Sequence, residues 1–98
     1  MTPEGKVKDK VRKILKEHNV YYFMPATGGY GKSGVPDFVC CVDGVFVGIE
    51  CKANGNMPTP LQSREIDLIR AAMGYAMVVR EDNTDEVHKL IREIRCQR

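Results

Sequence analysis

The sequence predicts an α/β domain: a small mixed β-sheet with a central hairpin, flanked by helices. Apolar residues at helical spacing alternate along the chain with short β-prone runs. An Asp-Gly pair, Asp43-Gly44, separates two of these runs and favours a two-residue hairpin turn, because both turn positions need positive φ. A length of 98 residues suits a single hydrophobic core. We therefore expect residues 1–98 to form one domain.

The N-terminal third is predicted to contain one helix and one strand. Thr2 is positioned as the N-cap of the helix and Pro3 as its first residue. The helix should run to about His18, and its apolar stripe consists of Val7, Val11, Ile14 and Leu15. A β-prone run over residues 20–24 follows, and we expect its aromatic residues to pack beneath the sheet. The next segment, residues 26–34, contains four glycines and is predicted to be a loop.

A second helix is predicted after the hairpin. Thr59 and Pro60 begin it, Gln62 holds the capping-box position, and Gly74 is placed to end it. The strand predicted at residues 75–79 should lie parallel to the second strand of the hairpin, because a helical crossover connects them.

The last predicted element is a third helix. Asn83 and Glu86 have the spacing of a capping box. The apolar stripe of this helix consists of Val87, Leu90, Ile91 and Ile94.

Composition and cysteine usage exclude several classes of protein. Hydrophobic residues are 43% and charged residues 29%, which is the balance of a folded soluble protein. The apolar run at residues 45–49 is too short to span a bilayer, and no signal peptide opens the chain. The four cysteines form no C-x-x-C pair and His18 lies far from His88 in sequence, so a zinc site is poorly supported. We expect the cysteines to be small buried residues in a reducing compartment.

The positive charge is concentrated near the N-terminus. Residues 1–34 contain seven Lys and Arg residues against three Asp and Glu residues, whereas residues 35–98 contain eight against ten. A basic face fits a polyanionic partner such as nucleic acid, although a charge-rich helix is also typical of an ordinary solvated surface.

The predicted hairpin places two acidic residues opposite each other. With a two-residue turn, Val42 faces Val45, and counting outward pairs Asp37 with Glu50. Their Cβ atoms should lie about 4.5–5.5 Å apart, and Lys52 shares their face of the sheet. Two opposed carboxylates destabilise a strand pair unless something compensates their charge.

A divalent cation would compensate these acids. Mg²⁺ and Mn²⁺ prefer carboxylate, carbonyl and water oxygens, and Lys52 is suited to hold a nucleophilic water or to stabilise negative charge. Two acids, a lysine and a metal ion are the parts needed for phosphodiester hydrolysis. Each fragment alone is also typical of a solvated strand, so the prediction depends on their juxtaposition.

Three short segments resemble a known nuclease signature. They are Gly34-Val35-Pro36-Asp37, Glu50-Cys51-Lys52 and Pro60-Leu61-Gln62. Together they resemble the PD-(D/E)xK nucleases and, more narrowly, the virus-type replication-repair nuclease (VRR-NUC) domain in its stand-alone, phage-type form. The resemblance covers nearly the whole chain and implies a restriction-endonuclease-like core.

The resemblance implies a role for each matching residue. Asp37 and Glu50 would bind Mg²⁺ or Mn²⁺ together with the main-chain carbonyl of Cys51, and Lys52 would assist the attacking water. Glu4 matches an acid that relatives direct at the metal from the first helix, although interaction with the helix dipole would explain it equally well.

Gln62 corresponds to a family glutamine near the active site, although the capping box alone also explains it.

Stand-alone members of the family are similar to Holliday junction resolvases, which are homodimers. A chain with one catalytic set needs a second copy to cut two strands of a four-way junction. We expect this branched DNA to be contacted at its phosphates by Tyr30, Lys32 and Ser33 of the glycine-rich loop and by the Lys-rich first helix. The expected location is the cytoplasm of a bacterium or of a phage-infected cell. Two alternatives remain: a nuclease acting on flaps, ends or nicked duplex, and a non-catalytic DNA-binding module.

Overall fold

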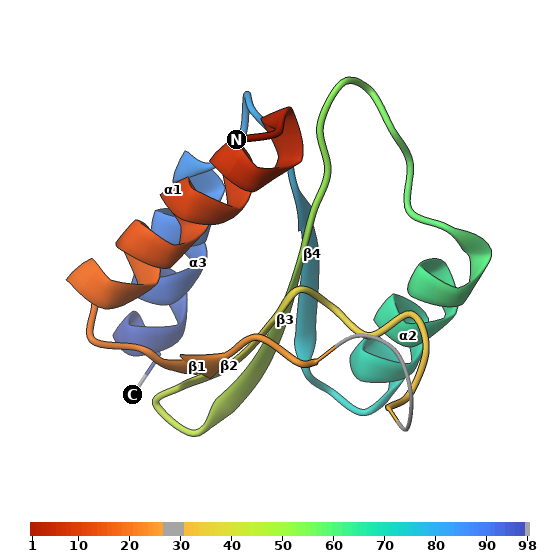
Figure 1. The fold of residues 1–98 in the computed structure, drawn as a ribbon. Coiled ribbons are helices and arrows are strands. Elements are labelled where there is room, and N and C mark those ends of the chain that lie inside the picture. Colours follow the sequence, from red (N-terminus) through yellow and green to blue (C-terminus); the bar gives the residue numbers. More distant parts are fainter. Residues whose placement is uncertain (27–30, 98) are drawn as a thin grey trace.

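The computed structural model describes residues 1–26 and 31–97, which form a four-stranded sheet with helices on both faces (Figure 1). The elements, in chain order, are α1 (Pro3–Glu17), β1 (Tyr21–Phe23), β2 (Phe38–Val42), β3 (Val45–Cys51), α2 (Pro60–Ala71), β4 (Tyr75–Val79) and α3 (Asp85–Cys96). This order and the mixed α/β class confirm the fold predicted from the sequence. None of the described helices is long and apolar enough to cross a membrane.

The sheet is built around the predicted hairpin. Its strand order is β1-β2-β3-β4, in which β1, β2 and β3 are antiparallel neighbours and β4 is parallel to β3. Val42 faces Val45 at the turn, and the register continues to Phe38 opposite Ile49. Asp43 and Gly44 have φ values of 49° and 85°, so both turn residues lie in the left-handed region that this turn requires. The hairpin and its register are therefore confirmed.

The hydrophobic core lies between one face of the sheet and the pair α1 and α3 (Figure 1). Alternate strand residues such as Phe38, Cys40 and Val42 point into it, because successive side chains of a strand project to opposite faces. The apolar stripes of α1 and α3 pack against them. No residue of α2 belongs to this cluster. The α2 face of the sheet is therefore less covered.

Two sequence expectations about burial are wrong in part. Tyr22 packs against Phe38 with ring centroids 5.8 Å apart, but Tyr21 and Phe23 are exposed, because β1 turns these two side chains away from the core. The same alternation buries Cys40 and exposes Cys41. Cys96 is also exposed, so only Cys40 and Cys51 are buried as expected.

The ends of α2 and α3 also correct the sequence analysis. At the end of α2, the left-handed residue is Met73, with φ of 71°, and Gly74 follows it as the donor of a closing hydrogen bond to the Ile69 carbonyl at 3.0 Å. The predicted capping box of α3 is wrong. Asn83 instead accepts a hydrogen bond from the Arg80 backbone N–H, and α3 begins after Thr84.

The two histidines lie far apart in sequence but meet in the fold. His18 Nε2 lies 2.7 Å from His88 Nδ1, which joins the C-terminal end of α1 to α3. Among the described residues, no third His, Cys, Asp or Glu completes a metal-binding group with them. This pair is therefore a contact between two helices that cover the core.

Candidate active site

The acidic residues from β2 and β3 meet where β3 approaches its C-terminal end. Asp37 directly precedes β2, and one further step of the hairpin register places it beside Glu50. Asp37 Oδ2 accepts a hydrogen bond from the backbone N–H of Cys51 at 2.9 Å. This bond fixes the Asp37 carboxylate against β3 and leaves its second oxygen, Oδ1, for another partner.

Glu50 is the most deeply buried charged residue of the site, with 2% of its side chain exposed. Its Oε2 atom accepts a hydrogen bond from Gln62 Nε2 at 3.0 Å and lies 3.6 Å from Lys52 Nζ. Its Oε1 atom is buried and has no hydrogen-bond partner within the described part of the chain. An orphaned carboxylate oxygen in the interior is costly, and a cation or a hydrogen-bond donor at this position would remove that cost.

Burial, followed by the nearby charge of Asp37, raises the pKa of Glu50 from 4.5 to about 7, although Lys52 opposes the shift. The charge of Glu4 contributes in the same direction as Asp37. Without a bound cation, the ionised form of Glu50 is therefore destabilised by its burial and by the neighbouring negative charge. A bound cation would relieve this destabilisation and lower the pKa again.

Lys52 lies beside Glu50 with 11% of its side chain exposed. Its backbone N–H donates to the Val79 carbonyl at 3.0 Å, which extends the parallel pairing with β4 one residue past the end of β3. The ammonium group is thereby held on the same face as Glu50, as the sequence predicts for residues two apart on a strand.

The first two turns of α1 contribute two charged residues, Glu4 and Lys8. In Figure 1, this end of α1 lies at the same end of the molecule as the C-terminal ends of β3 and β4. Lys8 Nζ lies 3.6 Å from Glu4 Oε2 and 3.6 Å from Asp37 Oδ1, so the lysine bridges the helix and the hairpin. Partial burial alone would lower the pKa of Lys8, but the charges of Asp37 and Glu4 outweigh it and raise the pKa.

Sequence reasoning did not select Lys8. The available signal was its position four residues after Glu4, which places both side chains on one face of a helix. The contact with Asp37 depends on how α1 packs against the sheet, and no local pattern indicates that.

Gln62 satisfies both interpretations made from the sequence. Thr59 Oγ1 accepts from the backbone N–H of Gln62 at 3.2 Å, and Gln62 Oε1 accepts from the backbone N–H of Thr59 at 2.9 Å, so the capping box is complete. The amide nitrogen of the same side chain remains free to donate to Glu50. The start of α2 therefore positions Gln62 at the buried acid.

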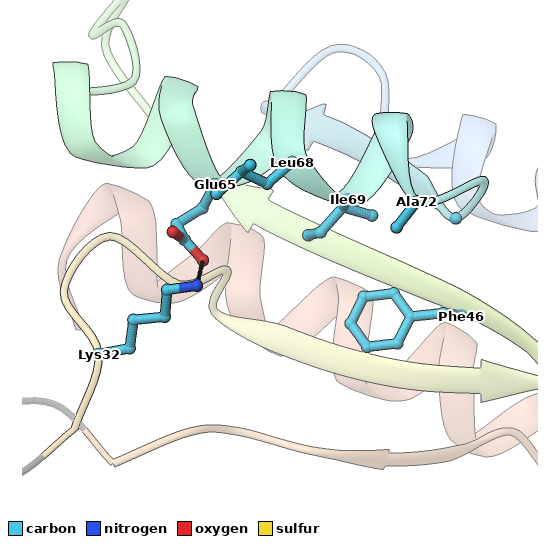
Figure 2. Close-up of a pocket in the computed structure, with 7 residues that line it drawn as sticks. Lys32, Phe46, Glu65, Leu68, Ile69 and Ala72 are labelled. Atoms are coloured by element: carbon cyan, nitrogen blue, oxygen red, sulfur yellow. Dashed lines mark ion pairs between the residues drawn. The ribbon is translucent and has the colours of Figure 1, made fainter.

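Two of the three loop residues expected to contact DNA, Lys32 and Ser33, lie within the described part of the chain. Tyr30 lies outside the described residues. Ser33 is exposed, and Lys32 Nζ forms an ion pair with Glu65 Oε1 of α2 at 3.3 Å. Figure 2 shows this pair at one end of an apolar hollow of about 340 Å³, lined also by Phe46, Leu68, Ile69, Ala72 and Gly74. Lys32 therefore already has an acidic partner in the free protein.

The donor set fits a divalent cation held by few protein ligands. Among the described residues, no three His, Cys, Asp or Glu side chains come together as a ready-made metal cage. Glu50 Oε1 is an orphaned carboxylate oxygen beside Asp37, and the Lys8 ammonium lies 3.6 Å from both Asp37 Oδ1 and Glu4 Oε2. Mg²⁺ commonly uses one or two carboxylates and completes its shell with water and substrate phosphate. This pattern agrees with the residues present.

Structural comparison connects this geometry to a family. No family model and no curated protein matches the sequence. Among solved structures, one described as a VRR_NUC domain matches with a TM-score of 0.76 and 26% identity, covering 94% of this chain and 97% of the other. A second, described as a VRR_NUC domain protein, matches with a TM-score of 0.70 and 19% identity, covering 98% and 88%.

Both matches cover nearly the whole chain. That the chain is a stand-alone, phage-type member stays a prediction. The resemblance indicated by the Pro-Asp, Glu-Cys-Lys and Pro-Leu-Gln segments is confirmed at the level of the fold, because nearly the whole chain matches the mixed α/β fold of VRR_NUC domain structures.

Proposed function

We propose that this protein is a Mg²⁺- or Mn²⁺-dependent DNA endonuclease that resolves four-way junctions as a homodimer. The observation that carries the proposal is the buried Glu50 carboxylate, which has an unpartnered oxygen and lies next to both Asp37 and Lys52. A domain that only binds DNA gains nothing from negative charge facing phosphates, whereas a metal-dependent nuclease needs it.

Asp37, Glu50 and the main-chain carbonyl of Cys51 would hold the metal ion, with Glu4 as a further acid from α1. The bound ion would supply Lewis-acid activation of the phosphodiester and of a water molecule. Gln62 fixes the rotamer of Glu50 through its amide, and the Cys51 N–H fixes that of Asp37. These second contacts orient the carboxylates before substrate arrives.

Lys52 acts on the substrate side of the site. Its ammonium orients the attacking water and stabilises the negative charge that develops on the phosphoryl oxygens. The water oxygen bonds to phosphorus and gives up a proton to solvent as the bond to the leaving sugar oxygen breaks, and that oxygen takes up a proton from solvent. The products are one phosphate monoester end and one hydroxyl end.

The proposed homodimer follows from the substrate. One chain carries one catalytic set, and paired cuts in a twofold-symmetric junction need two sets related by the same symmetry. The exposed aromatic side chains of Tyr21, Phe23 and Phe46 supply apolar surface for contact with a second copy. DNA phosphates would be contacted by the basic first helix and by Tyr30, Lys32 and Ser33.

The direct test is cleavage of a synthetic four-way junction and of a linear duplex of matched sequence, each with Mg²⁺ or Mn²⁺. Asp37→Asn keeps the shape of the side chain but removes its charge, and we expect it to abolish cleavage. Asp43→Asn is the matched control, because Asp43 lies at the opposite end of the same hairpin and asparagine tolerates its positive φ. Sedimentation of the free protein measures the oligomeric state.

Each outcome separates the alternatives. Paired nicks in the junction alone, lost in Asp37→Asn but kept in Asp43→Asn, would support the resolvase. Equal cutting of linear, flapped or nicked DNA would instead indicate a general nuclease. Binding of the junction without cleavage under either metal would leave only a non-catalytic module.

A further inference from the structure

Two acids of the site, Asp37 and Glu4, already have a positively charged partner within the chain, the ammonium group of Lys8. Lys8 Nζ lies 3.6 Å from Asp37 Oδ1, just before β2, and 3.6 Å from Glu4 Oε2 of α1. The Lys8 side chain is 30% exposed, while that of Asp37 is 18% exposed. An exposed helical pair of Glu and Lys is common and weak, but a lysine that also bridges to a partly buried acid on another element is not explained by helix stability alone.

The oxygen that Lys8 approaches is the one that a metal ion would need. Asp37 Oδ2 is committed to the Cys51 N–H at 2.9 Å, so Oδ1 is the oxygen left to bind an ion. Glu4, the first-helix acid of the proposed metal site, faces the same ammonium group. Two cations cannot share these carboxylates closely without repulsion.

We propose that Lys8 is a built-in counter-ion, which neutralises Asp37 and Glu4 in the metal-free protein and must be displaced from Asp37 Oδ1 when a divalent cation binds. The inference rests on the metal site of the proposed function. It adds that the chain itself competes with the metal, so that Lys8 weakens metal affinity in the free protein. After displacement, the ammonium is available to the anionic substrate at the same place.

Calorimetric titration of Mn²⁺ into DNA-free protein tests this competition. Lys8→Met keeps the aliphatic stem and removes the charge, and we expect it to bind Mn²⁺ about tenfold more tightly than the wild type, because both the competitor and its repulsion are gone. Lys10→Met is the matched control on the same helix. Lys10 is exposed, and we expect its replacement to change affinity less than about twofold.

A second variant and a second measurement distinguish a change in Mn²⁺ affinity from misfolding of one variant. Lys8→Gln removes the charge with a polar side chain, and thermal denaturation with and without Mn²⁺ reports binding through stability. Both Lys8 variants should be less stable than the wild type without metal and should show a larger increase in Tm on adding Mn²⁺.

Unchanged or weaker Mn²⁺ binding by both Lys8 variants would overturn the inference, as would the absence of Mn²⁺ binding by any variant. Tighter binding by both variants, with Lys10→Met like the wild type, would support it. Because no DNA is present, this result is independent of cleavage. A protein that shows the expected affinities but cuts no DNA would refute the proposed function and leave the role of Lys8 intact.

Discussion

The side-chain amide of Gln62 donates to Glu50 Oε2 at 3.0 Å, so a residue of the first turn of α2 holds the buried acid of β3. The oxygen of the same amide accepts from the Thr59 backbone at 2.9 Å. Gln62 therefore cannot rotate away from Glu50 without opening the capping box. The orientation of the buried acid and the start of α2 are coupled through one side chain.

Two variants separate the cap from the active-site contact. Thr59→Ala removes only the cap hydroxyl, and we expect it to lower the free energy of unfolding by about 1 kcal/mol with little effect on cleavage. Gln62→Ala also removes the donor to Glu50, so the cleavage rate should fall at least about tenfold, in line with a hydrogen bond to a charged group. Urea denaturation and initial cleavage rates measure the two effects. An equal loss of rate in both variants would mean that the cap, and not the amide, matters for activity.

The pKa of Glu50 predicts how stability depends on pH. In the folded protein this pKa is about 7 against an ordinary value of 4.5, so the folded state holds the proton more tightly than the unfolded chain. The contribution of Glu50 to stability is therefore fully present below pH 4.5 and is lost as the pH rises through about 7. Glu50→Gln does not titrate and avoids this loss.

Without metal, Glu50→Gln should be more stable than the wild type above pH 7, by up to about 3 kcal/mol, and the difference should shrink toward pH 4.5. Urea denaturation in EDTA across this range measures it. Adding Mn²⁺ should stabilise the wild type and not the variant. Parallel stability curves for the two proteins would show that Glu50 does not titrate in this range.

Local sequence signals predicted the elements that create the site. The Asp43-Gly44 turn alone defines the hairpin register, and that register brings Asp37 beside Glu50. The capping box at Thr59 likewise placed Gln62 at the start of α2. In both cases a few neighbouring residues determine the backbone geometry, so no knowledge of the packing is needed.

Features that depend on packing between elements were missed or mistaken. Lys8 reaches Asp37 only because α1 packs across the end of the sheet. Tyr21 and Phe23 are exposed, whereas Tyr22 between them packs against the core. Asn83 has the spacing of an N-cap, but its side chain closes the turn after β4 by accepting from the Arg80 backbone. A local motif cannot distinguish these partners.

Removal of Lys52 should separate stability from catalysis. Lys52→Met leaves the buried Glu50 without its ion-pair partner, so the metal-free protein should lose about 3 kcal/mol or more of stability at neutral pH. Cleavage should fall by about a hundredfold or more, since the group that orients water is gone. The double variant Glu50→Gln with Lys52→Met should recover stability but not activity. Failure to recover stability would show that Lys52 contributes mainly through packing of its aliphatic stem.

Alanine substitutions at two glycines test which contacts position the Pro36-Asp37 segment. Gly34 and Gly44 have φ values of 81° and 85°, so alanine should cost each about 1–2 kcal/mol of backbone strain. A Cβ at Gly34 would also lie 2.5 Å from the Leu61 carbonyl oxygen, whereas a Cβ at Gly44 would meet nothing within 4 Å. Gly34→Ala must therefore push the segment before Asp37 away from the start of α2.

We expect Gly34→Ala to lose at least about 2 kcal/mol more stability than Gly44→Ala, because a clash with backbone cannot be relieved by a side-chain rotation. Cleavage should fall with it, since the displaced segment carries Asp37 away from Glu50, while Gly44→Ala should remain active. Denaturation and cleavage assays on the two variants measure this contrast. If both variants lost the same stability and kept the same activity, the contact between Gly34 and Leu61 would not hold Asp37 in place.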